Sequence, residues 1–195
     1  MRTVAETETD ASTPKYKLHR TVVLVGMMGS GKSAIGRALA QMLNVPMMDS
    51  DAEIEAASRQ TIAEIFERDG EAFFRDREAE VIDRLLTGEP CILSTGGGAF
   101  MAERNRQAIH DKGVSVFLNA SLETLWERVR HKDTRPLLRT ADPKQTLSDL
   151  LSQRQPIYEL ADLRVETRLS YEIEQTADLV IQAMLTRPDV LEAQE

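Results

Sequence analysis

Residues 21–33 read TVVLVGMMGSGKS, and this stretch decides the fold. Thr21 to Val25 is a short aliphatic and β-branched run that ends at a glycine, which is typical of a strand buried on both faces of a parallel sheet. The next residues, Gly26 to Ser33, fit the P-loop pattern G-x-x-x-x-G-K-[ST]. From Lys32 onward apolar residues recur at helical spacing, so the motif lies between a predicted strand and a predicted helix, as its chemistry requires.

Each part of this loop has a physical role in holding phosphate. Glycines allow backbone N–H groups to approach phosphate oxygens at the positive end of the following helix. The lysine can reach the β- and γ-phosphates of a nucleotide, and the final serine offers a hydroxyl to Mg²⁺. The alternative is a glycine-rich turn without a ligand. The sequence predicts an ATP site made of Gly29, Ser30, Gly31, Lys32, Ser33 and Ala34.

Two common classes of P-loop protein do not fit the rest of the chain. None of Asn44, Asn105 and Asn119 begins the Asn-Lys-x-Asp segment with which switch GTPases read their base. An ATPase that activates water would show an apolar strand ending in a magnesium-holding aspartate. Here the apolar residues 91–94 lead into Thr95 and three glycines instead. A reaction other than nucleotide hydrolysis is therefore expected.

Strand-like and helix-like patterns alternate outward from the P-loop. Five strands separated by helices predict a three-layer α/β sandwich with a parallel sheet. Within the pattern at 71–86, Phe73 and Phe74 are both candidates for the buried face. The predicted strands are 21–25, 45–48, 91–94, 114–118 and 163–166, and the predicted helices are 32–44, 52–58, 61–68, 71–86, 104–112, 121–130, 146–155 and 171–185.

The chain is expected to be one domain with two tails. Residues 1–16, rich in Thr, Glu, Ala and Asp, predict an N-terminal tail without fixed structure, and 17–187 form the domain. Charged and helix-breaking residues at 131–145 predict a mobile lid. Arg187-Pro188-Asp189 ends the last helical pattern, and the polar residues 188–195 predict a solvated C-terminal tail.

Composition and charge limit the cellular location, the partners and the metals that we expect. The 195 residues carry 24 Lys+Arg against 32 Asp+Glu, a net charge of −8 that weighs against nucleic-acid binding. One cysteine, Cys91, suits a reducing compartment, and the longest apolar stretch is too short to cross a membrane. The three histidines show no metal-ligand spacing. We expect a cytoplasmic protein without a membrane partner and without a metal other than nucleotide-bound Mg²⁺.

Two carboxylates follow the second predicted strand, in Asp49-Ser50-Asp51. Open parallel sheets bind ligands at the carboxyl ends of their strands, and strand alternation gives the two aspartates the same general direction. Asp49 can hold magnesium through water, and Asp51 can accept a hydrogen bond from a substrate hydroxyl and act as its base. The alternative is that one or both cap the next helix.

Four further segments carry basic or glycine-rich signatures. They are FFRDRE at 73–78, STGGGA at 94–99, RPLL at 135–138 and RQPIYELA at 154–161. An arginine such as Arg75 or Arg77, seen alone, would be a solvated surface cation. Together with GMMGSGKS and DSD, these blocks occur in the order found in shikimate kinases, and the chain resembles that family from about residue 21 to residue 185.

The resemblance implies a nucleoside monophosphate kinase-like fold with strand order 2-3-1-4-5 and a closing lid. It implies ATP-dependent phosphorylation of the shikimate 3-hydroxyl to give shikimate 3-phosphate and ADP, a step on the route to chorismate and aromatic amino acids. It also implies that the enzyme is a monomer and requires Mg²⁺. Ala34 departs from the threonine that many relatives carry, and no nucleotide-contacting arginine is evident at 164–172. The matching positions are Asp51 for the acceptor hydroxyl and its proton, Arg75 and Arg154 for the carboxylate, Gly97 in the substrate-binding turn, and Arg135 as the lid arginine on the ATP phosphates.

Two other functions stay open on the residues alone. One is a kinase for another small acceptor, such as gluconate or a nucleoside monophosphate. The other is a catalytically silent nucleotide-binding module that signals to a partner protein, against which the presence of Lys32, Ser33, Asp51 and Arg135 argues.

Overall fold

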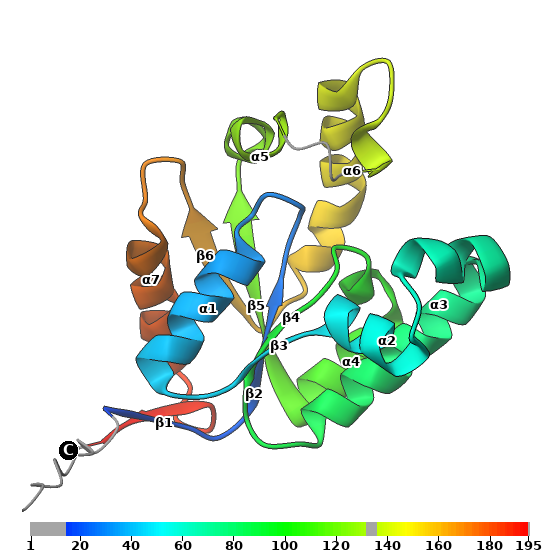
Figure 1. Cartoon of the computed structure of the whole chain (residues 1–195). Coiled ribbons are helices and arrows are strands. Elements are labelled where there is room, and N and C mark those ends of the chain that lie inside the picture. The colour runs from blue at the N-terminus through cyan, green and yellow to red at the C-terminus, as the bar shows by residue number, and fades with distance from the viewer. Residues whose placement is uncertain (1–14, 132–135, 195) are drawn as a thin grey trace, which may run out of the picture.

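A computed structural model describes residues 15–131 and 136–194 of the chain (Figure 1). Within these residues five strands form a parallel sheet in the order β3-β4-β2-β5-β6. Counted along the chain from β2, this is the predicted order 2-3-1-4-5, which is confirmed. The strands are β2 (Thr21–Val25), β3 (Met47–Asp49), β4 (Ile92–Ser94), β5 (Gly113–Ala120) and β6 (Leu163–Thr167).

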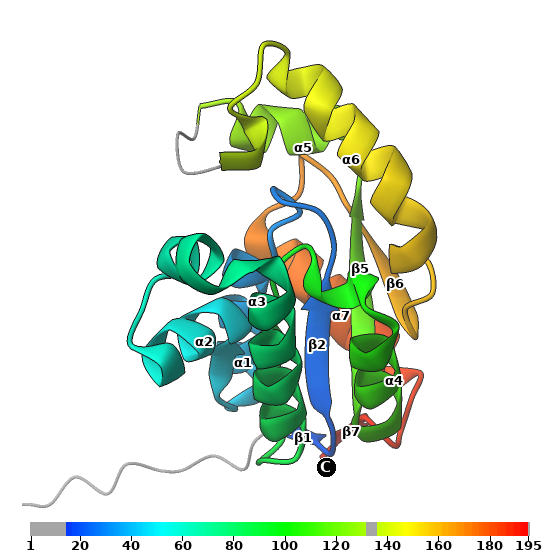
Figure 2. The same cartoon turned by 90° about the vertical axis from the view of Figure 1, so that its right-hand side faces the viewer.

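Helices cover both faces of this sheet, so the predicted three-layer sandwich is confirmed (Figures 1 and 2). On one face lie α1 (Lys32–Leu43) and α7 (Ile173–Leu185), and on the other lie α3 (Ile62–Leu86) and α4 (Glu103–Lys112), with α2 (Ser50–Ser58) beside α3. The remaining helices lie toward the carboxyl ends of the strands (Figure 1). They are α5 (Leu122–Val129), α6 (Pro143–Tyr158) and the short η1 (Ala99–Met101) and η2 (Pro136–Leu138).

The central strand β2 is buried on both faces, as its aliphatic run predicts. Val22 and Leu24 pack into the cluster formed with α1 and α7. Val23 and Val25 pack into the opposite cluster, which includes residues of α3 and α4. Because alternate side chains of a strand face opposite ways, this one strand joins both halves of the core and fixes where its carboxyl end, the P-loop, emerges.

The helix α3 consists of two arms that meet at Gly70. Thr61 and Glu64 form the predicted capping box, with the Thr61 N–H donating to the Glu64 carboxylate at 2.7 Å. Gly70 has φ 83° and ψ 174°, a conformation that side chains disfavour, and it bends the helix between the two predicted segments. On the second arm Phe74 is buried as predicted, whereas the prediction for Phe73 is wrong: it is 37% exposed.

The lid-side helix α6 begins earlier than predicted, at Pro143 instead of Thr146. Asp142 caps it by accepting a hydrogen bond from the Gln145 N–H at 3.0 Å, and Pro143 occupies the first turn, where its missing N–H costs nothing. The last three residues of the expected lid, 143–145, are therefore helical, and 132–135 lie outside the described residues.

The C-terminal residues are not the solvated tail that their polarity predicts. Leu191–Ala193 forms strand β7, which pairs antiparallel with β1 (Tyr16–Leu18). Val190 and Leu191 are fully buried and complete the cluster on the α1 and α7 face. This pairing also includes Tyr16 from the expected N-terminal tail, and residues 1–14 lie outside the described part of the chain.

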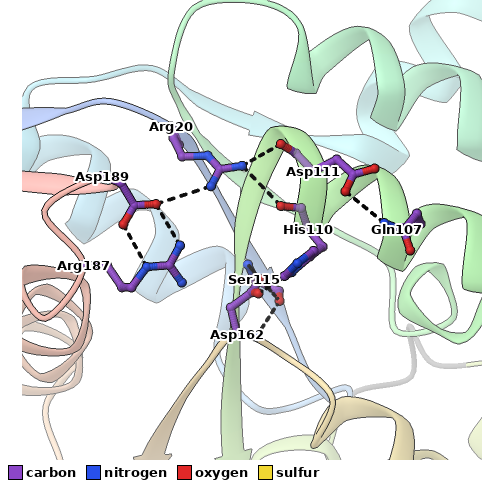
Figure 3. A network of polar contacts seen from close by, with 8 residues as sticks. All are labelled: Arg20, Gln107, His110, Asp111, Ser115, Asp162, Arg187 and Asp189. Atoms are coloured by element: carbon purple, nitrogen blue, oxygen red, sulfur yellow. Dashed lines mark hydrogen bonds and ion pairs between the residues drawn. The ribbon is translucent and has the colours of Figure 1, made fainter.

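A network of polar contacts lies at the end of the sheet where the strands begin, which is their amino-terminal end (Figure 3). Arg20 donates to the carbonyl oxygens of His110 and Asp111 at 3.2 and 2.7 Å. Asp162 accepts hydrogen bonds from the N–H and hydroxyl of Ser115 at 2.8 and 2.7 Å and contacts His110 Nδ1 at 2.8 Å. Burial opposes ionisation of Asp162, but these hydrogen bonds outweigh it and lower its pKa. The network is structural.

No helix in the described part of the chain is long and apolar enough to cross a membrane.

Candidate active site

The P-loop connects β2 to α1 and leaves the first turn of α1 open to a ligand. Gly29 and Gly31 have φ values of 84° and 98°, which glycine adopts readily, and Gly31 is the N-cap of α1. This cap supplies no side-chain hydrogen bond, and the first turn contains no acidic residue. The N–H groups at the start of α1 therefore form a site for an anion.

Lys32 lies back across this loop. Its Nζ atom donates to the carbonyl oxygens of Gly26 and Met27 at 2.7 and 3.0 Å, so the ammonium is held beside the glycines. Ser30 is fully buried, and its hydroxyl has no hydrogen-bond partner among the described residues. The ammonium charge of Lys32 and the N–H groups at the start of α1 thus lie on the same loop, which is the electrostatic requirement for binding phosphate.

A cavity of about 550 Å³ follows the carboxyl ends of the strands from one side of the P-loop to the other. This volume is typical of a small-molecule site. Its lining on one side includes Asp49, Asp51, Gly96 and Gly97, in the middle Gly29, Gly31, Lys32, Ser33 and Ala34, and on the other side Arg128, Thr167, Leu169, Tyr171 and Ile173.

The two aspartates after β3 have different surroundings. Oδ1 of Asp49 accepts hydrogen bonds from the N–H groups of Asp51 and Ala52 at 3.0 and 3.2 Å, so the capping alternative is confirmed for Asp49, which also lines the cavity. Asp51 does not cap the helix, and its buried Oδ1 has no hydrogen-bond partner in the described structure.

The pKa of Asp51 is raised to about 6. Burial is the largest cause, the negative charges of Asp49 and Glu78 add to it, and Lys32 opposes it. A carboxyl group with this pKa is mostly ionised near neutral pH but takes up a proton readily, which is the property required of a general base.

Three glycines after β4 bring the acceptor residues together. A Cβ atom built on Gly96 would lie 3.0 Å from Asp51 Oδ1, and one built on Gly97 would lie 3.1 Å from Arg154 Nη1. One built on Gly98 would lie 2.7 Å from Arg75 Nη2. The side chains come from α2, α6 and α3, so one carboxylate and two guanidinium groups from three helices border the same turn.

Arg75 is held by a partner that the sequence analysis did not single out. Its Nη1 donates to both oxygens of Glu78, which is 1% exposed, at 3.1 and 2.9 Å. From α4, Arg104 Nη2 donates to the Arg75 carbonyl oxygen at 2.6 Å. Glu78 belongs to the FFRDRE block and lies one helical turn after Arg75, which was the available signal. Arg77 instead makes an exposed ion pair with Glu80 at 2.7 Å, as expected of a surface arginine.

Arg128 is a second residue that the sequence analysis missed. It extends from α5 to the P-loop, where Nη1 donates to the Gly29 carbonyl oxygen at 3.2 Å, and Nη2 donates to the Arg168 carbonyl oxygen at 2.9 Å. Burial lowers the pKa of its guanidinium group. It therefore joins the P-loop to the residues after β6, the region in which no nucleotide-contacting arginine was evident. Arg135, the expected lid arginine, lies outside the described residues.

A P-loop before α1, a five-stranded parallel sheet in this order and a cavity that extends from the loop to the glycine turn after β4 define the class of P-loop kinases. The sequence pattern of the shikimate kinase family matches residues 28–185. The chain is 66% identical to the shikimate kinase of Ruegeria pomeroyi over 175 residues (90% of each chain) and 61% identical to that of Cereibacter sphaeroides over 179 residues (92% of this chain and 89% of the relative). The shikimate kinase of Acinetobacter baumannii, solved in complex with shikimate, superposes with a TM-score of 0.79 at 38% identity, covering 86% of this chain and 93% of that one. The chain belongs to the shikimate kinase family and is a kinase.

Proposed function

We propose that this protein transfers the γ-phosphoryl group of ATP to the 3-hydroxyl of shikimate, giving shikimate 3-phosphate and ADP for the synthesis of chorismate and aromatic amino acids. One observation carries the proposal. Asp51, Arg75 and Arg154 converge on the Gly96 to Gly98 turn, and this turn borders the cavity that the P-loop lines. A carboxylate-bearing polyol acceptor fits an arginine pair next to a carboxylate base.

The acceptor would be held by charge and oriented by geometry. Arg75 and Arg154 bind its carboxylate, because guanidinium groups match a carboxylate with two parallel donors. Gly97 leaves room for the Arg154 guanidinium beside the turn, since a Cβ atom there would lie 3.1 Å from Arg154 Nη1 and 3.5 Å from the Tyr158 hydroxyl. The substrate hydroxyl then lies against Asp51.

In the transfer step the acceptor oxygen attacks the γ-phosphorus, and the bond from that phosphorus to the bridging oxygen of ADP breaks. Asp51 accepts the hydroxyl proton, for which its pKa of about 6 is suited. Lys32 and the N–H groups of the P-loop offset the charge of the phosphates. Arg135 has the role of a lid arginine on the same phosphates, at a position in the chain between α5 and α6.

The nucleotide would occupy the P-loop and the side of the cavity toward α7. Gly29, Ser30, Gly31, Lys32, Ser33 and Ala34 hold the phosphates. The base lies toward Leu169 and Ile173, two of the exposed apolar residues of the chain, with Arg128 between it and the loop.

Mg²⁺ fits the donors at this site. Ser33 and Asp49 both line the cavity. They offer a hydroxyl and a carboxylate oxygen, which are ligands that this hard cation prefers. When bound, the ion supplies positive charge to the β- and γ-phosphates.

We further propose that the protein acts as a cytoplasmic monomer whose lid lies in the chain between α5 and α6. Its net charge of −8 disfavours nucleic acid as a partner. Light scattering of the purified protein tests the monomer, and a stable dimer would contradict it.

Phosphorus NMR of the product tests the chemistry of the proposal. After complete conversion of shikimate with excess Mg²⁺-ATP, we expect one phosphomonoester whose phosphorus couples to the ring proton at carbon 3. Coupling to another ring proton would contradict the assigned hydroxyl, and phosphate alone would mean that water is the acceptor.

A further inference from the structure

Tyr158, the last residue of α6, lies where the acceptor turn, the P-loop and the sheet meet. Its side chain is fully buried. The hydroxyl donates to the Gly97 carbonyl oxygen at 2.6 Å and contacts the Met27 sulfur at 4.0 Å. The ring stacks on Phe117 of β5, with centroids 5.4 Å apart. None of the roles proposed above uses this residue.

The hydroxyl is tied to the acceptor site in two ways. Besides donating to the Gly97 carbonyl oxygen, it lies beside the same glycine as the guanidinium group of Arg154, one turn earlier on the same helix, and that group opposes the rise that burial causes in the pKa of the phenol. A Cβ built on Gly97 would lie 3.1 Å from Arg154 Nη1 and 3.5 Å from the Tyr158 hydroxyl. The phenol, the guanidinium and the glycine turn therefore form one packed unit beside the cavity.

The helix α6 lacks one backbone hydrogen bond close to Arg154. Pro156 lies inside α6, two residues after Arg154, and its missing N–H leaves the carbonyl oxygen of Ser152 without the usual helical donor. A helix is weakened where a proline interrupts its hydrogen bonds. The contacts of Tyr158 supply a fixed point just beyond this interruption.

The phenol remains a donor over the physiological pH range. Burial raises the pKa of Tyr158, although the charge and hydrogen bond of Arg154 oppose the rise. The protonated hydroxyl can therefore donate to Gly97, and its oxygen can accept from Arg154.

We propose that Tyr158 is a positioning residue for the acceptor: through its hydroxyl it fixes the guanidinium of Arg154 and the Gly97 turn relative to one another. This inference rests on the proposed function, because Arg154 is assigned there to the substrate carboxylate. Preorganising two parts of a site in this way lowers the ordering cost when substrate binds.

Steady-state kinetics of Tyr158→Phe tests the role, because phenylalanine keeps the stacking on Phe117 and removes only the hydroxyl. Loss of one hydrogen bond predicts a rise of about 3- to 10-fold in the KM for shikimate. The KM for ATP should change less than about 2-fold, since the P-loop residues that hold the nucleotide are untouched. Tyr16→Phe in β1, the same change far from the cavity, should leave both KM values unchanged.

A double-mutant cycle separates positioning from general support of the fold. If Tyr158 acts through Arg154, then Tyr158→Phe should add little to the KM for shikimate in an Arg154→Ala background. Full additivity would overturn the inference, as would an equal rise in both KM values accompanied by a lower Tm. A shikimate-active parent protein whose Tyr158→Phe variant has parental kinetics would also overturn it and leave the proposed function standing. A parent without shikimate-dependent turnover would instead refute the proposed function.

Discussion

Arg75 and Glu78 lie one turn apart on the second arm of α3, and Nη1 of the arginine contacts both carboxylate oxygens of the buried glutamate. The glutamate therefore fixes one nitrogen of the guanidinium. The other terminal nitrogen, Nη2, donates to the exposed Glu71 carboxylate at 3.4 Å, and both terminal nitrogens lie beside Gly98 of the acceptor turn. The charge at this position is held in place before any substrate arrives.

The first prediction concerns Arg75. We expect Arg75→Ala to raise the KM for shikimate by about 10- to 100-fold, the effect of losing a charged hydrogen bond, with little change in the KM for ATP. Arg75→Lys should not restore binding, because an ammonium cannot contact Glu78 and a carboxylate through one planar fork. Arg77→Ala, which removes an exposed arginine two residues away, is the matched control and should behave like the parent. An unchanged shikimate KM in Arg75→Ala would mean that the carboxylate binds elsewhere.

The second prediction uses the glycine turn. Gly98 has φ −90° and ψ −16°, so alanine is compatible with its backbone, but the added Cβ would lie 2.7 Å from Arg75 Nη2. Gly98→Ala should therefore displace the guanidinium and raise the shikimate KM by about 10-fold or more. In the control Gly88→Ala the nearest atom to the added Cβ is 3.6 Å away, so no change is expected. If Gly98→Ala has parental kinetics, the turn does not constrain the acceptor arginine.

The third prediction concerns the proton. Asp51→Asn should lower kcat by about 10²- to 10⁴-fold, the usual contribution of a general base, while ATP binding is mostly kept. In the parent, kcat/KM for shikimate should fall as pH drops below about 6, because the carboxyl group becomes protonated and can no longer accept the hydroxyl proton. A pH profile of parent and variant checks both points. Parental turnover in the variant would exclude the base role.

The fourth prediction is a gain in stability from the same substitution. Folding raises the pKa of Asp51 from 3.8 to about 6, so the folded state favours the protonated form and holds the charged form at a cost above pH 6. Asp51→Asn should be more stable than the parent by about 1–3 kcal/mol at pH 7.5, and the difference should shrink toward zero as pH falls to 4. Urea unfolding at several pH values measures it. A variant less stable than the parent at pH 7.5 would show that the charge is well accommodated.

Much of the fold follows from local patterns. The run Thr21 to Val25 predicted a strand buried on both faces, and the separate helical patterns at 61–68 and 71–86 predicted the division of α3 at Gly70. The β1 and β7 pairing was missed because it joins two short segments from opposite ends of the chain, and neither carries a strand signal strong enough alone. Phe73 and Phe74 adjoin in an apolar pair, and the sequence does not reveal that Phe73 lies beside the Arg77 guanidinium while Phe74 enters the core.

The site shows the same division. The P-loop was predictable because all its parts are contiguous. Asp51 was a candidate from its place after a predicted strand, whereas Arg75, Gly97 and Arg154 were predictable only through the order of the family blocks. The support of Arg75 by Glu78 and the reach of Arg128 from α5 to the Gly29 carbonyl oxygen are tertiary contacts. In the sequence both residues look like ordinary charges on helices.

The most direct test of the central claim is ADP release by the purified protein with Mg²⁺-ATP, compared under matched conditions with shikimate, quinate, gluconate, nucleoside monophosphates and no acceptor. The account predicts a rate with shikimate far above the rate with every other acceptor. Demonstrable ATP binding without a response to shikimate would contradict it, and a faster rate with gluconate or a nucleoside monophosphate would assign the acceptor pocket to that compound instead.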